Sequence, residues 1–389
     1  MQKILFQLGG GDSIVGLLYF VFIMIFFFFY PRLMLMQIML KLERTVKDLE
    51  EMSNRSKAFI IKEISKKPSK VLKDSINRFF EFFVIPPVSL DPYGIVGKLD
   101  HIIQDEKDRF DYFVDQIAPK ENKEKKANLT MGLAGGITLH EIEKIVRHYV
   151  ELIKETKSYQ IAIILQMQMP LIEKMAKALY AGTKSLTKGE PIGDGFGPLV
   201  VANLIGNKRT REIEEDIVMA TVGIKGRTAF VLKAKGPGGR LGRPGKAVEK
   251  IVKKNKIARI ITIDAAAKLE GEKTGSLAEG VGVAMGGPGV ERSYMENVAV
   301  SRKIPLDSII VKMSPEEAIT PMRKAIKDAI KDVTESIDRS LVRTKKGDKV
   351  IIVGVGNTSG IGNSGRDAKE VGKWVDKNEK KMKEKKKKK

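Results

Sequence analysis

An uncharged stretch near the N-terminus constrains this chain more than any other feature. Residues Ser13 to Tyr30 carry no charged side chain and are rich in Phe, Ile and Leu. A helix of about 20 apolar residues is long enough to span a bilayer. The stretch runs into Pro31-Arg32 without a small-residue cleavage site, which argues against a secretory signal peptide. We therefore predict one retained membrane span, residues 13–31, after a short tail of residues 1–12.

Charges on the two sides of the predicted span differ. Lys3 is offset by Asp12 before it, whereas Arg32, Lys41 and Arg44 follow it. Because basic residues flank membrane spans on the cytoplasmic side, the body of the protein should be cytoplasmic. The sequence thus predicts a single-pass protein of the cell membrane.

Residues 32–85 have the period of an amphipathic helix. Met39, Leu42, Val46 and Leu49 recur at spacings of three and four among lysines and glutamates. Two interpretations are open for this juxtamembrane segment. It either pairs with a copy of itself, which would give a homo-oligomer, or lies along the headgroups with its lysines toward anionic lipid.

Residues 86–183 are predicted to form a helical domain. Pro86-Pro87 and Asp91-Pro92 separate it from the preceding segment, because proline ends helices. Helical periodicity then covers residues 95–117, 139–154 and 161–180. The run from Lys120 to Lys126 is expected to be a solvated linker.

From about residue 184, short β-branched runs alternate with helical stretches. The predicted strands are residues 217–224, 228–234, 257–264, 308–313 and 349–355. The predicted helices are residues 198–205, 244–253, 291–302 and 315–340. Strands that alternate with helices predict an α/β domain, residues 184–365, with a mainly parallel sheet covered by helices on both faces.

The C-terminal residues 366–389 are predicted to be a terminal helix followed by a disordered tail. Lys377 to Lys389 is almost entirely lysine. Such a segment cannot bury a core, and it would attract nucleic acid or anionic lipid without sequence preference. A solubilising end is the alternative interpretation.

Composition excludes several kinds of site. The chain has no cysteine and three histidines, His101, His140 and His148, all before the α/β domain. Ser-His-Asp catalysis, Cys-His catalysis and thiolate metal sites are therefore excluded there. A metal would have to rest on carboxylates such as Asp194, Asp264, Glu270 and Glu291. We predict no metal and no cofactor.

Two aspartates have settings that suggest chemistry. Asp194 lies in a glycine-rich turn, Gly193 to Pro198, that opens a helix. Asp264 follows the predicted strand Ala258 to Ile263, at the carboxyl end where open α/β sheets place their active sites. Two such carboxylates could share a proton and perform acid–base catalysis. Alternatively, Asp194 caps its helix and Asp264 anchors the next loop.

Three glycine-rich loops are candidate binding elements. The loop Gly236 to Lys246 contains Arg240 and Arg243 but lacks the pattern of a phosphate loop. It is expected to act as a mobile lid, an anion cradle or a nucleic-acid contact. Loops around Gly239, Gly287 and Gly356 would hold an extended substrate. The predicted substrate-binding residues are Gly193, Gly195, Gly197, Gly239, Gly287, Gly356 and Asn357.

The α/β half resembles the phosphorylase/peptidase-type fold of spore germination protease and hydrogenase maturation endopeptidase. The resemblance rests on Gly193-Asp194-Gly195-Phe196-Gly197-Pro198, Ile263-Asp264-Ala265-Ala266-Ala267 and the loop Gly286 to Arg292. It implies that Asp194 and Asp264 are a catalytic pair acting on a peptide. In those families a Gly-x-Gly-Asn turn directly precedes the first aspartate. Here that turn is Gly354-Val355-Gly356-Asn357, which implies a circularly permuted domain.

Over its whole length the chain resembles an uncharacterised archaeal membrane family, domain of unknown function 1512. That resemblance implies one N-terminal span and a soluble cytoplasmic body. The sequence therefore predicts a membrane-anchored, aspartate-dependent peptidase. The alternative is a non-enzymatic membrane adaptor that binds a ligand or peptide in the same cleft and uses its lysine tail for RNA or anionic lipid.

Overall fold

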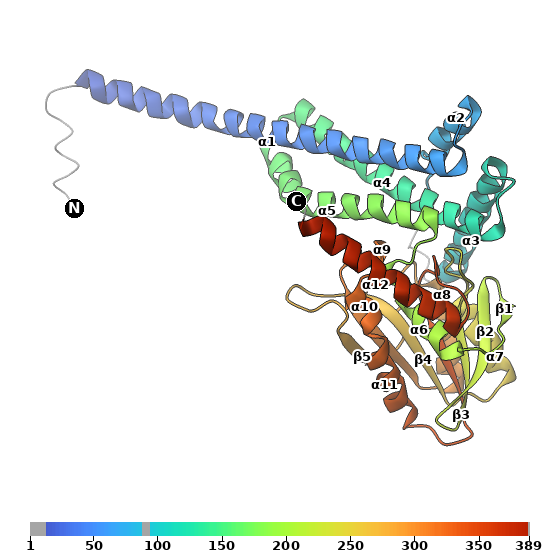
Figure 1. Cartoon of the computed structure of the whole chain (residues 1–389). Helices are drawn as coiled ribbons and strands as arrows, with labels where there is room; N and C mark the ends of the chain where they lie inside the picture. Colours follow the sequence, from blue (N-terminus) through green and yellow to red (C-terminus); the bar gives the residue numbers. More distant parts are fainter. Residues whose placement is uncertain (1–12, 88–93, 388–389) are drawn as a thin grey trace, which may run out of the picture. The chain divides into compact units, whose positions relative to one another are not determined.

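A computed structural model describes residues 13–87 and 94–387 of the chain (Figure 1). The predicted N-terminal tail, residues 1–12, and the Asp91-Pro92 break lie outside the described residues. The chain forms two compact units. One comprises Met1–Ser53 and His140–Ala176, and the other comprises Asn54–Leu139 and Lys177–Lys389.

The first unit is helical. It contains most of α1 (Ser13–Ile64), the second half of α4 (Lys123–Thr156) and the first part of α5 (Tyr159–Lys188). Ion pairs join α1 to α4, at Glu50–Arg147 (2.9 Å) and Glu43–Lys154 (3.1 Å). The buried residues of α1 here include Ile38, Leu42, Val46 and Leu49. These side chains are therefore buried within the chain, and pairing of the juxtamembrane helix with a second copy stays a prediction.

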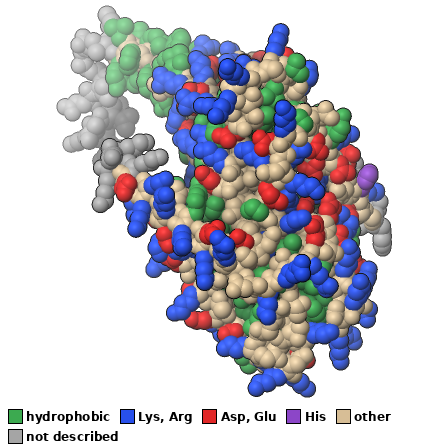
Figure 2. Space-filling model, turned by 45° about the vertical axis from the view of Figure 1, so that its right-hand side comes forward, with side chains coloured by type: hydrophobic (Ala, Val, Ile, Leu, Met, Phe, Trp, Pro, Cys, Tyr) green, Lys and Arg blue, Asp and Glu red, His purple; other side chains and the backbone are tan. Residues whose placement is uncertain are grey.

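The beginning of α1 is apolar and uncovered. Its large hydrophobic side chains from Leu17 to Tyr30 are almost all exposed, and Figure 2 shows them as a nearly continuous hydrophobic surface. Within the described residues, this is the one helix long and apolar enough to cross a membrane. The structure thus has the long apolar N-terminal helix that the sequence predicts.

The second unit begins with helices packed around an aromatic core. It contains the end of α1, α2 (Lys70–Phe79), α3 (Ile95–Ile117) and the start of α4. The expected helix over residues 32–85 is broken after Ile64, because Pro68 follows and the Ser69 side chain caps α2 by accepting from Leu72 N at 3.1 Å. The core includes Ile60, Ile76, Phe80, Phe110, Val114, Leu129, Leu133 and Ile137.

The predicted linker Lys120–Lys126 is wrong in its second half. Helix α4 begins at Lys123, and the side chain of Asn122 accepts from Lys125 N at 2.8 Å. Such a cap satisfies a backbone donor at the helix start. Several charges in this run also have partners inside the unit, as the site below shows, so they are not merely solvated.

A mixed seven-stranded sheet forms the centre of the second unit. Its order is β1-β2-β3-β7-β4-β6-β5. The strands are β1 Arg211–Glu214, β2 Ile217–Ile224, β3 Arg227–Ala234, β4 Arg259–Ala267, β5 Leu277–Val281, β6 Leu306–Met313 and β7 Lys349–Gly354. The four central strands β3, β7, β4 and β6 are parallel, whereas the other pairings are antiparallel. The α/β class and the largely parallel sheet are confirmed.

Helices cover both faces of this sheet. One face packs against α6 (Phe196–Ile205), α10 (Lys324–Asp328), α11 (Ile330–Leu341) and α12 (Gly365–Lys387). The other packs against α7 (Pro244–Lys254) and α8 (Val290–Arg302). Figure 1 shows α6 and α12 on one side of the strands. Burial on both faces explains why the central strands read as continuous β-branched runs.

The single helix predicted over residues 315–340 is divided. After α9 (Pro315–Ile319) the backbone is extended, and Pro321 forms an isolated bridge with Ile192. Proline lacks the N–H that a continuing helix would need, which explains the break. Beside this bridge, Gly193 N donates to Thr320 O at 3.1 Å, so the divided segment supports the turn that carries Asp194.

The lysine-rich end is also more ordered than predicted. Helix α12 continues to Lys387, so the expectation of a disordered tail from Lys377 is wrong up to that residue. Lysine and glutamate are good helix formers, and Glu379 pairs with Lys383 at the i, i+4 spacing that stabilises helices. Residues 388–389 lie outside the described part.

Candidate active site at the end of strand β4

Asp264 lies where β4 passes the end of its neighbour β7. The pairing between β4 and β7 ends at Ile263↔Gly354, whereas the pairing with β6 continues to Ala267↔Met313. Asp264 is therefore the first residue of β4 beyond β7. Its side chain is only 4% exposed, and Oδ1 accepts from Ala265 N at 2.6 Å.

Asp194 comes from a separate element, the single 3₁₀ turn η1 (Gly193–Gly195) before α6. Its Oδ2 accepts from the backbone N–H of Asn357 at 2.8 Å, across 163 residues of sequence. Gly195 occupies the N-cap position of α6, and no side chain caps that helix. The interpretation of Asp194 as a helix cap is therefore wrong.

Glycine allows η1 to approach the strand ends closely. A Cβ at Gly356, whose φ is +126°, would lie 2.0 Å from the carbonyl oxygen of Asp194. One at Gly197 would lie 2.3 Å from Val355 O and 2.5 Å from Ile263 O. Gly193 and Gly195 also face neighbouring backbone atoms. These predicted substrate-binding glycines therefore pack the two acids together and do not line an open loop.

The pKa values of both carboxyl groups are raised, and the charge of Asp194 contributes to the rise at Asp264. Burial, and then the charge of Asp194, raise the pKa of Asp264 from 3.8 to about 8, although the N–H of Ala265 opposes the rise. Burial raises the pKa of Asp194 as well, against the hydrogen bond from Asn357. Like charges held close together cannot both ionise readily. At neutral pH Asp264 is therefore largely protonated, and burial disfavours the charged form of Asp194 as well.

A free strand edge lies next to the pair. Ala265, Ala266 and Ala267 pair with β6 on one side, but no strand among the described residues pairs with them on the β7 side. Their exposure increases from half-buried at Ala265 to exposed at Ala267. On the β7 side, the backbone of Ala265 to Ala267 therefore has no strand partner among the described residues.

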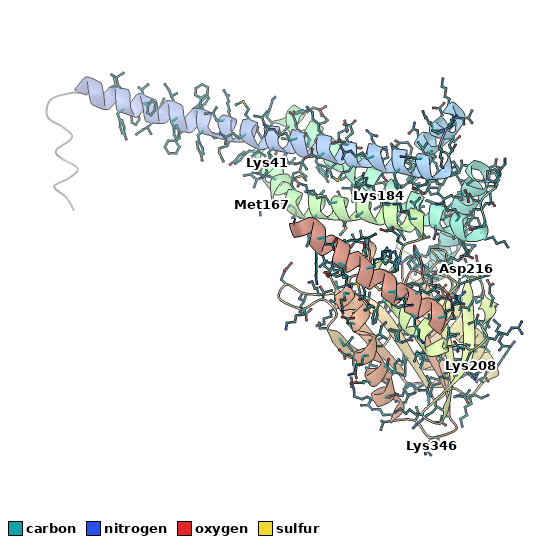
Figure 3. All side chains as sticks on the ribbon, viewed as in Figure 1. Lys41, Met167, Lys184, Lys208, Asp216 and Lys346 are labelled. Atoms are coloured by element: carbon teal, nitrogen blue, oxygen red, sulfur yellow. The ribbon has the colours of Figure 1, made fainter. Side chains whose placement is uncertain are left out.

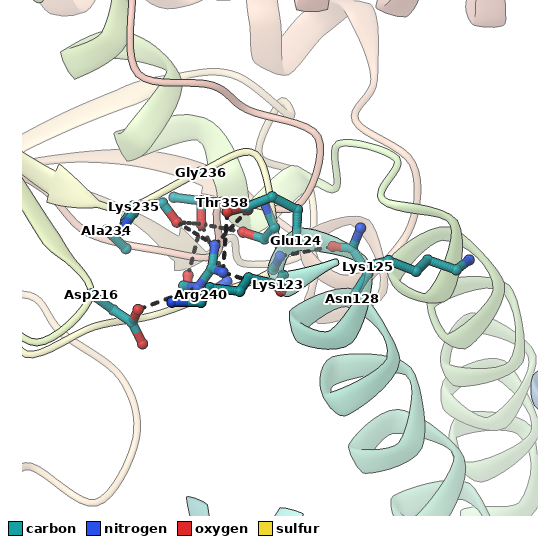
Figure 4. A network of polar contacts seen from close by, with 12 residues as sticks. Lys123, Glu124, Lys125, Asn128, Asp216, Ala234, Lys235, Gly236, Arg240 and Thr358 are labelled. Carbon is teal, nitrogen blue, oxygen red and sulfur yellow. Dashed lines mark hydrogen bonds and ion pairs between the residues drawn. The ribbon is translucent and has the colours of Figure 1, made fainter. Parts of the chain in front are cut away.

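The loop Gly236 to Lys246 lies against the first turns of α4 (Figure 4). Gly238 N donates to Glu124 Oε2 at 2.5 Å, and Gly239 N donates to Asn128 Oδ1 at 2.8 Å. The protein's own side chains thus occupy the amides that were expected to bind an anion. The expectation of an anion cradle or a mobile lid is wrong for this part of the loop.

Arg240 fixes the same loop. Its guanidinium contacts Glu124 at 2.6 Å and Asp216 at 3.3 Å. Burial works against ionisation of Glu124, but hydrogen bonds from Arg240 and Gly238 N hold its pKa below the usual value. We call Glu124, Asn128, Gly238, Gly239, Arg240 and Thr358 the loop cluster.

The loop cluster is connected to the acid pair through Thr358. Its hydroxyl donates to Gly238 O at 2.7 Å, and its N–H donates to Arg240 O at 3.1 Å. The preceding residue is Asn357, whose N–H holds Asp194. A Cβ at Gly239 would lie 3.4 Å from Asn357 Oδ1. Gly239 therefore supports the turn behind the acids, and Asn357 is in direct contact with one of them.

Gly287 differs from the other predicted residues. It is exposed, and a Cβ placed there would meet no atom within 4 Å. The structure does not bring it into contact with the aspartates.

Sequence reasoning missed Glu124, Asn128 and Thr358. Glu124 and Asn128 lie four residues apart on one helix face, but their position in a charged run hid that spacing.

Other acids do not join the pair. Glu291 accepts from Gly245 N at 2.6 Å and pairs with Arg243 at 3.1 Å, and Glu270 is exposed. Within residues 13–87 and 94–387 there is no cluster of three or more His, Asp or Glu side chains suited to a metal ion. The site consists of two carboxyl groups and the surrounding backbone.

Comparisons with known proteins identify a family but no relative of known function. Residues 16–189 match the model described as the DUF1512 N-terminal domain of a protein of unknown function. Residues 192–362 match the C-terminal domain of the same family. No curated protein and no solved structure matches the chain significantly. Together the two models cover most of the sequence, and the chain belongs to the DUF1512 family.

Proposed function

We propose that this protein is a membrane-anchored peptidase that uses Asp194 and Asp264 as its catalytic pair. The observation that carries the proposal is the meeting of two carboxyl groups, each with a raised pKa, beside an open strand edge. Asp264 would hold the proton, since its pKa is raised to about 8. Asp194 would then be the base that activates water, while Asp264 protonates the scissile carbonyl oxygen.

The open edge of β4 favours a peptide as the substrate. An extended peptide can add to an exposed strand edge through main-chain hydrogen bonds. Ala265 to Ala267 offer such an edge directly beyond Asp264. A peptide paired there would run past Asp264, so its scissile bond would lie near the two carboxyl groups.

We also propose that the α/β domain is a circularly permuted form of the phosphorylase/peptidase-type fold. Support comes from the contact of Asn357 with Asp194, because the glycine turn of β7 lies where the permuted arrangement requires it.

Peptide cleavage by the full-length protein, reconstituted in lipid nanodiscs, tests the activity. A quenched fluorescent peptide library should be cleaved by the wild type, and Asp194→Asn or Asp264→Asn should lower the rate by at least about 100-fold. Asp332→Asn, at an exposed position on α11, is the matched control and should leave the rate unchanged. Absence of cleavage by the wild type, or equal rates in all variants, would refute the proposal.

The pH profile gives a second, independent readout. Activity requires that the pair keep one proton. It should therefore fall as the pH rises through about 8, where Asp264 loses its proton. A rate that continues to rise above this pH would assign the catalysis to another group.

The apolar start of α1 supports membrane anchoring with the body in the cytoplasm. Its length, composition and exposure fit a single span. The basic residues after Tyr30 support the orientation. Protease protection in sealed vesicles tests both, since only a cytoplasmic body is digested in vesicles whose cytoplasmic face points outward.

A second candidate, a non-enzymatic adaptor, is favoured by α12. Arg366, Lys369, Lys373, Lys377 and Lys380 are all exposed and recur at spacings of three and four. A cationic stripe of this kind binds RNA or anionic lipid electrostatically. Removal of residues 377–389 should then weaken binding to RNA or to anionic vesicles, most strongly at low salt. Such removal should leave peptide cleavage unchanged if the protein is a peptidase.

A further inference from the structure

Helix α1 carries a second apolar stripe. Tyr19, Phe22, Phe26, Phe29, Leu33, Met36 and Leu40 follow one another at alternating spacings of three and four. Each of these side chains is between 47% and 67% exposed. Alternating spacings of three and four are the a and d positions of a heptad repeat, which place side chains along one seam of a helix. We call these seven residues the outer stripe.

The end of the outer stripe is its most informative part. In the span every residue is apolar, so any spacing can be found there. Leu40, however, lies ten residues beyond Tyr30, or about 15 Å along the helix axis. Leu33, Met36 and Leu40 are therefore apolar and at least half exposed beyond the predicted span, where α1 no longer needs to contact lipid tails.

The rest of α1 shows that the outer stripe is a separate face. Ile38, Leu42, Val46 and Leu49, on the opposite side of the helix, are buried within the chain. The next two stripe positions after Leu40 are Glu43 and Lys47, and Glu43 pairs with Lys154 of the same chain. The outer stripe thus ends where the charged part of the helix begins.

We propose that the outer stripe pairs with the same stripe of a second copy, as a parallel two-helix coiled coil that starts in the membrane and ends at Leu40. A parallel pair with two-fold symmetry brings each residue against its own copy, so a heptad stripe is complementary to itself. Gln37 and Met39 flank the stripe near Leu40 and carry no charge, so no like charges oppose each other there.

Anchoring strengthens the choice of a second copy as the partner. Two anchored copies are held in the same orientation, as a parallel pair requires. Confinement to a membrane also raises their effective concentration. The parallel orientation rests on the proposed anchoring but not on peptidase activity. Failure of the anchoring would be seen separately, as loss of the protein from the membrane fraction.

Cysteine cross-linking tests the pairing directly, because the natural chain has no cysteine. Leu33→Cys, Met36→Cys and Leu40→Cys are introduced one at a time into the full chain in native membranes and then oxidised. Each should give at least five-fold more disulfide-linked dimer than Lys41→Cys, the control. Lys41 is exposed beside Leu40 on the same helix but lies off the stripe (Figure 3). Equal cross-linking at all four positions, or none, would overturn the proposal.

A charge substitution distinguishes the outer stripe from a second exposed apolar surface in the same unit. Helix α5 also exposes apolar residues, Ile164, Met167 and Leu171. Leu40→Glu should reduce the dimer fraction in nanodiscs at least ten-fold, whereas Met167→Glu should leave it unchanged. Both positions are at least half exposed, so the fold should tolerate the charge. Loss of the dimer with Met167→Glu alone would assign the interface to α5. If neither variant changes the dimer fraction, pairing through the outer stripe is refuted, and contact of the stripe with lipid headgroups is the explanation that is left.

Discussion

The acid pair and the loop cluster lie next to each other, but the pKa values of their acidic side chains are shifted in opposite directions. In the loop cluster, Glu124 is matched by Arg240 and by a backbone N–H, and its pKa is lowered. In the acid pair, Asp194 and Asp264 are both carboxyl groups, and both pKa values are raised. Paired opposite charges hold a structure together, whereas unmatched like charges tend to occur where a protein performs chemistry. The comparison therefore indicates a structural role for the loop cluster and supports the catalytic role that we propose for the acid pair.

The largest effect should come from the glycine turn that holds Asp194. Gly356→Ala places a Cβ 2.0 Å from Asp194 O at a φ of +126°, and it should lower the free energy of unfolding by more than about 3 kcal/mol. Gly287→Ala is the control, since its φ is +78° but its Cβ meets no atom, and it should cost about 1 kcal/mol. Urea unfolding followed by the fluorescence of Trp374, the single tryptophan, measures both. Equal losses would show that the turn does not pack on Asp194.

Breaking the loop cluster should have the next largest effect. Glu124→Ala leaves Gly238 N without its acceptor and removes the nearer of the two acidic partners of Arg240, which should cost about 3 kcal/mol of unfolding free energy. Glu155→Ala, an exposed position on the same helix α4, should cost almost nothing. The same urea titration applies. If the two variants unfold at the same urea concentration, Glu124 does not stabilise the loop.

Removing one acid of the pair should stabilise the protein, in contrast to the two preceding substitutions. The folded-state pKa of Asp264, about 8, exceeds its ordinary value of 3.8, so the folded protein binds more protons between these values and the wild type loses stability as the pH rises through them. Asp264→Asn has no such loss and should gain about 2 kcal/mol over the wild type between about pH 5 and pH 8. The unfolding free energy of the control Asp332→Asn should have the same pH dependence as that of the wild type. If the unfolding free energy of Asp264→Asn depends on pH as that of the wild type does, the carboxyl group of Asp264 ionises freely in the folded protein.

The smallest effect concerns Lys233, a fully buried lysine whose ammonium group donates to Asn363 Oδ1 at 2.8 Å. Burial lowers its pKa from 10.5 to about 7, although Asp367 and Glu124 oppose the change. The folded protein binds fewer protons than the unfolded chain between these values, so wild-type stability should rise with pH there. Lys233→Met should remove about 1 kcal/mol of that rise between about pH 7 and pH 9. Urea midpoints across this range measure it, and the exposed Lys208→Met should keep the wild-type slope.

Much of the central fold could be predicted from the sequence. Buried strands are rich in β-branched residues, so the parallel strands β3, β7, β4 and β6 and the antiparallel β2 were recognisable, and each predicted strand overlaps its structural counterpart. The antiparallel edge strands β1 and β5 were not recognisable. Strand β1 has four residues, and β2 and β3 are joined by Lys225-Gly226, both with positive φ, instead of a typical Asn-Gly turn.

The site was predictable in part for a similar reason. Asp264 follows a recognisable strand, and the glycines around Asp194 mark a close approach of backbones. The partners of those glycines could not be read from the sequence, because Asn357 is 163 residues from Asp194 and Glu124 is 114 residues from Gly238. Local patterns show that a glycine is needed but not which distant atom requires it.

The contact between α4 and the glycine loop determines what can fold alone. The two family models meet between residues 189 and 192, as if the chain had two separable halves. Yet Asn54–Leu139 and Lys177–Lys389 form a single compact unit, and Glu124 and Asn128 supply acceptors for Gly238 and Gly239. A fragment that starts at the second half would leave these two amides without their acceptors and would take Glu124 away from Arg240. The boundary between the family models is therefore not a boundary of autonomous folding, because α4 of the N-terminal half completes the structure of the C-terminal half.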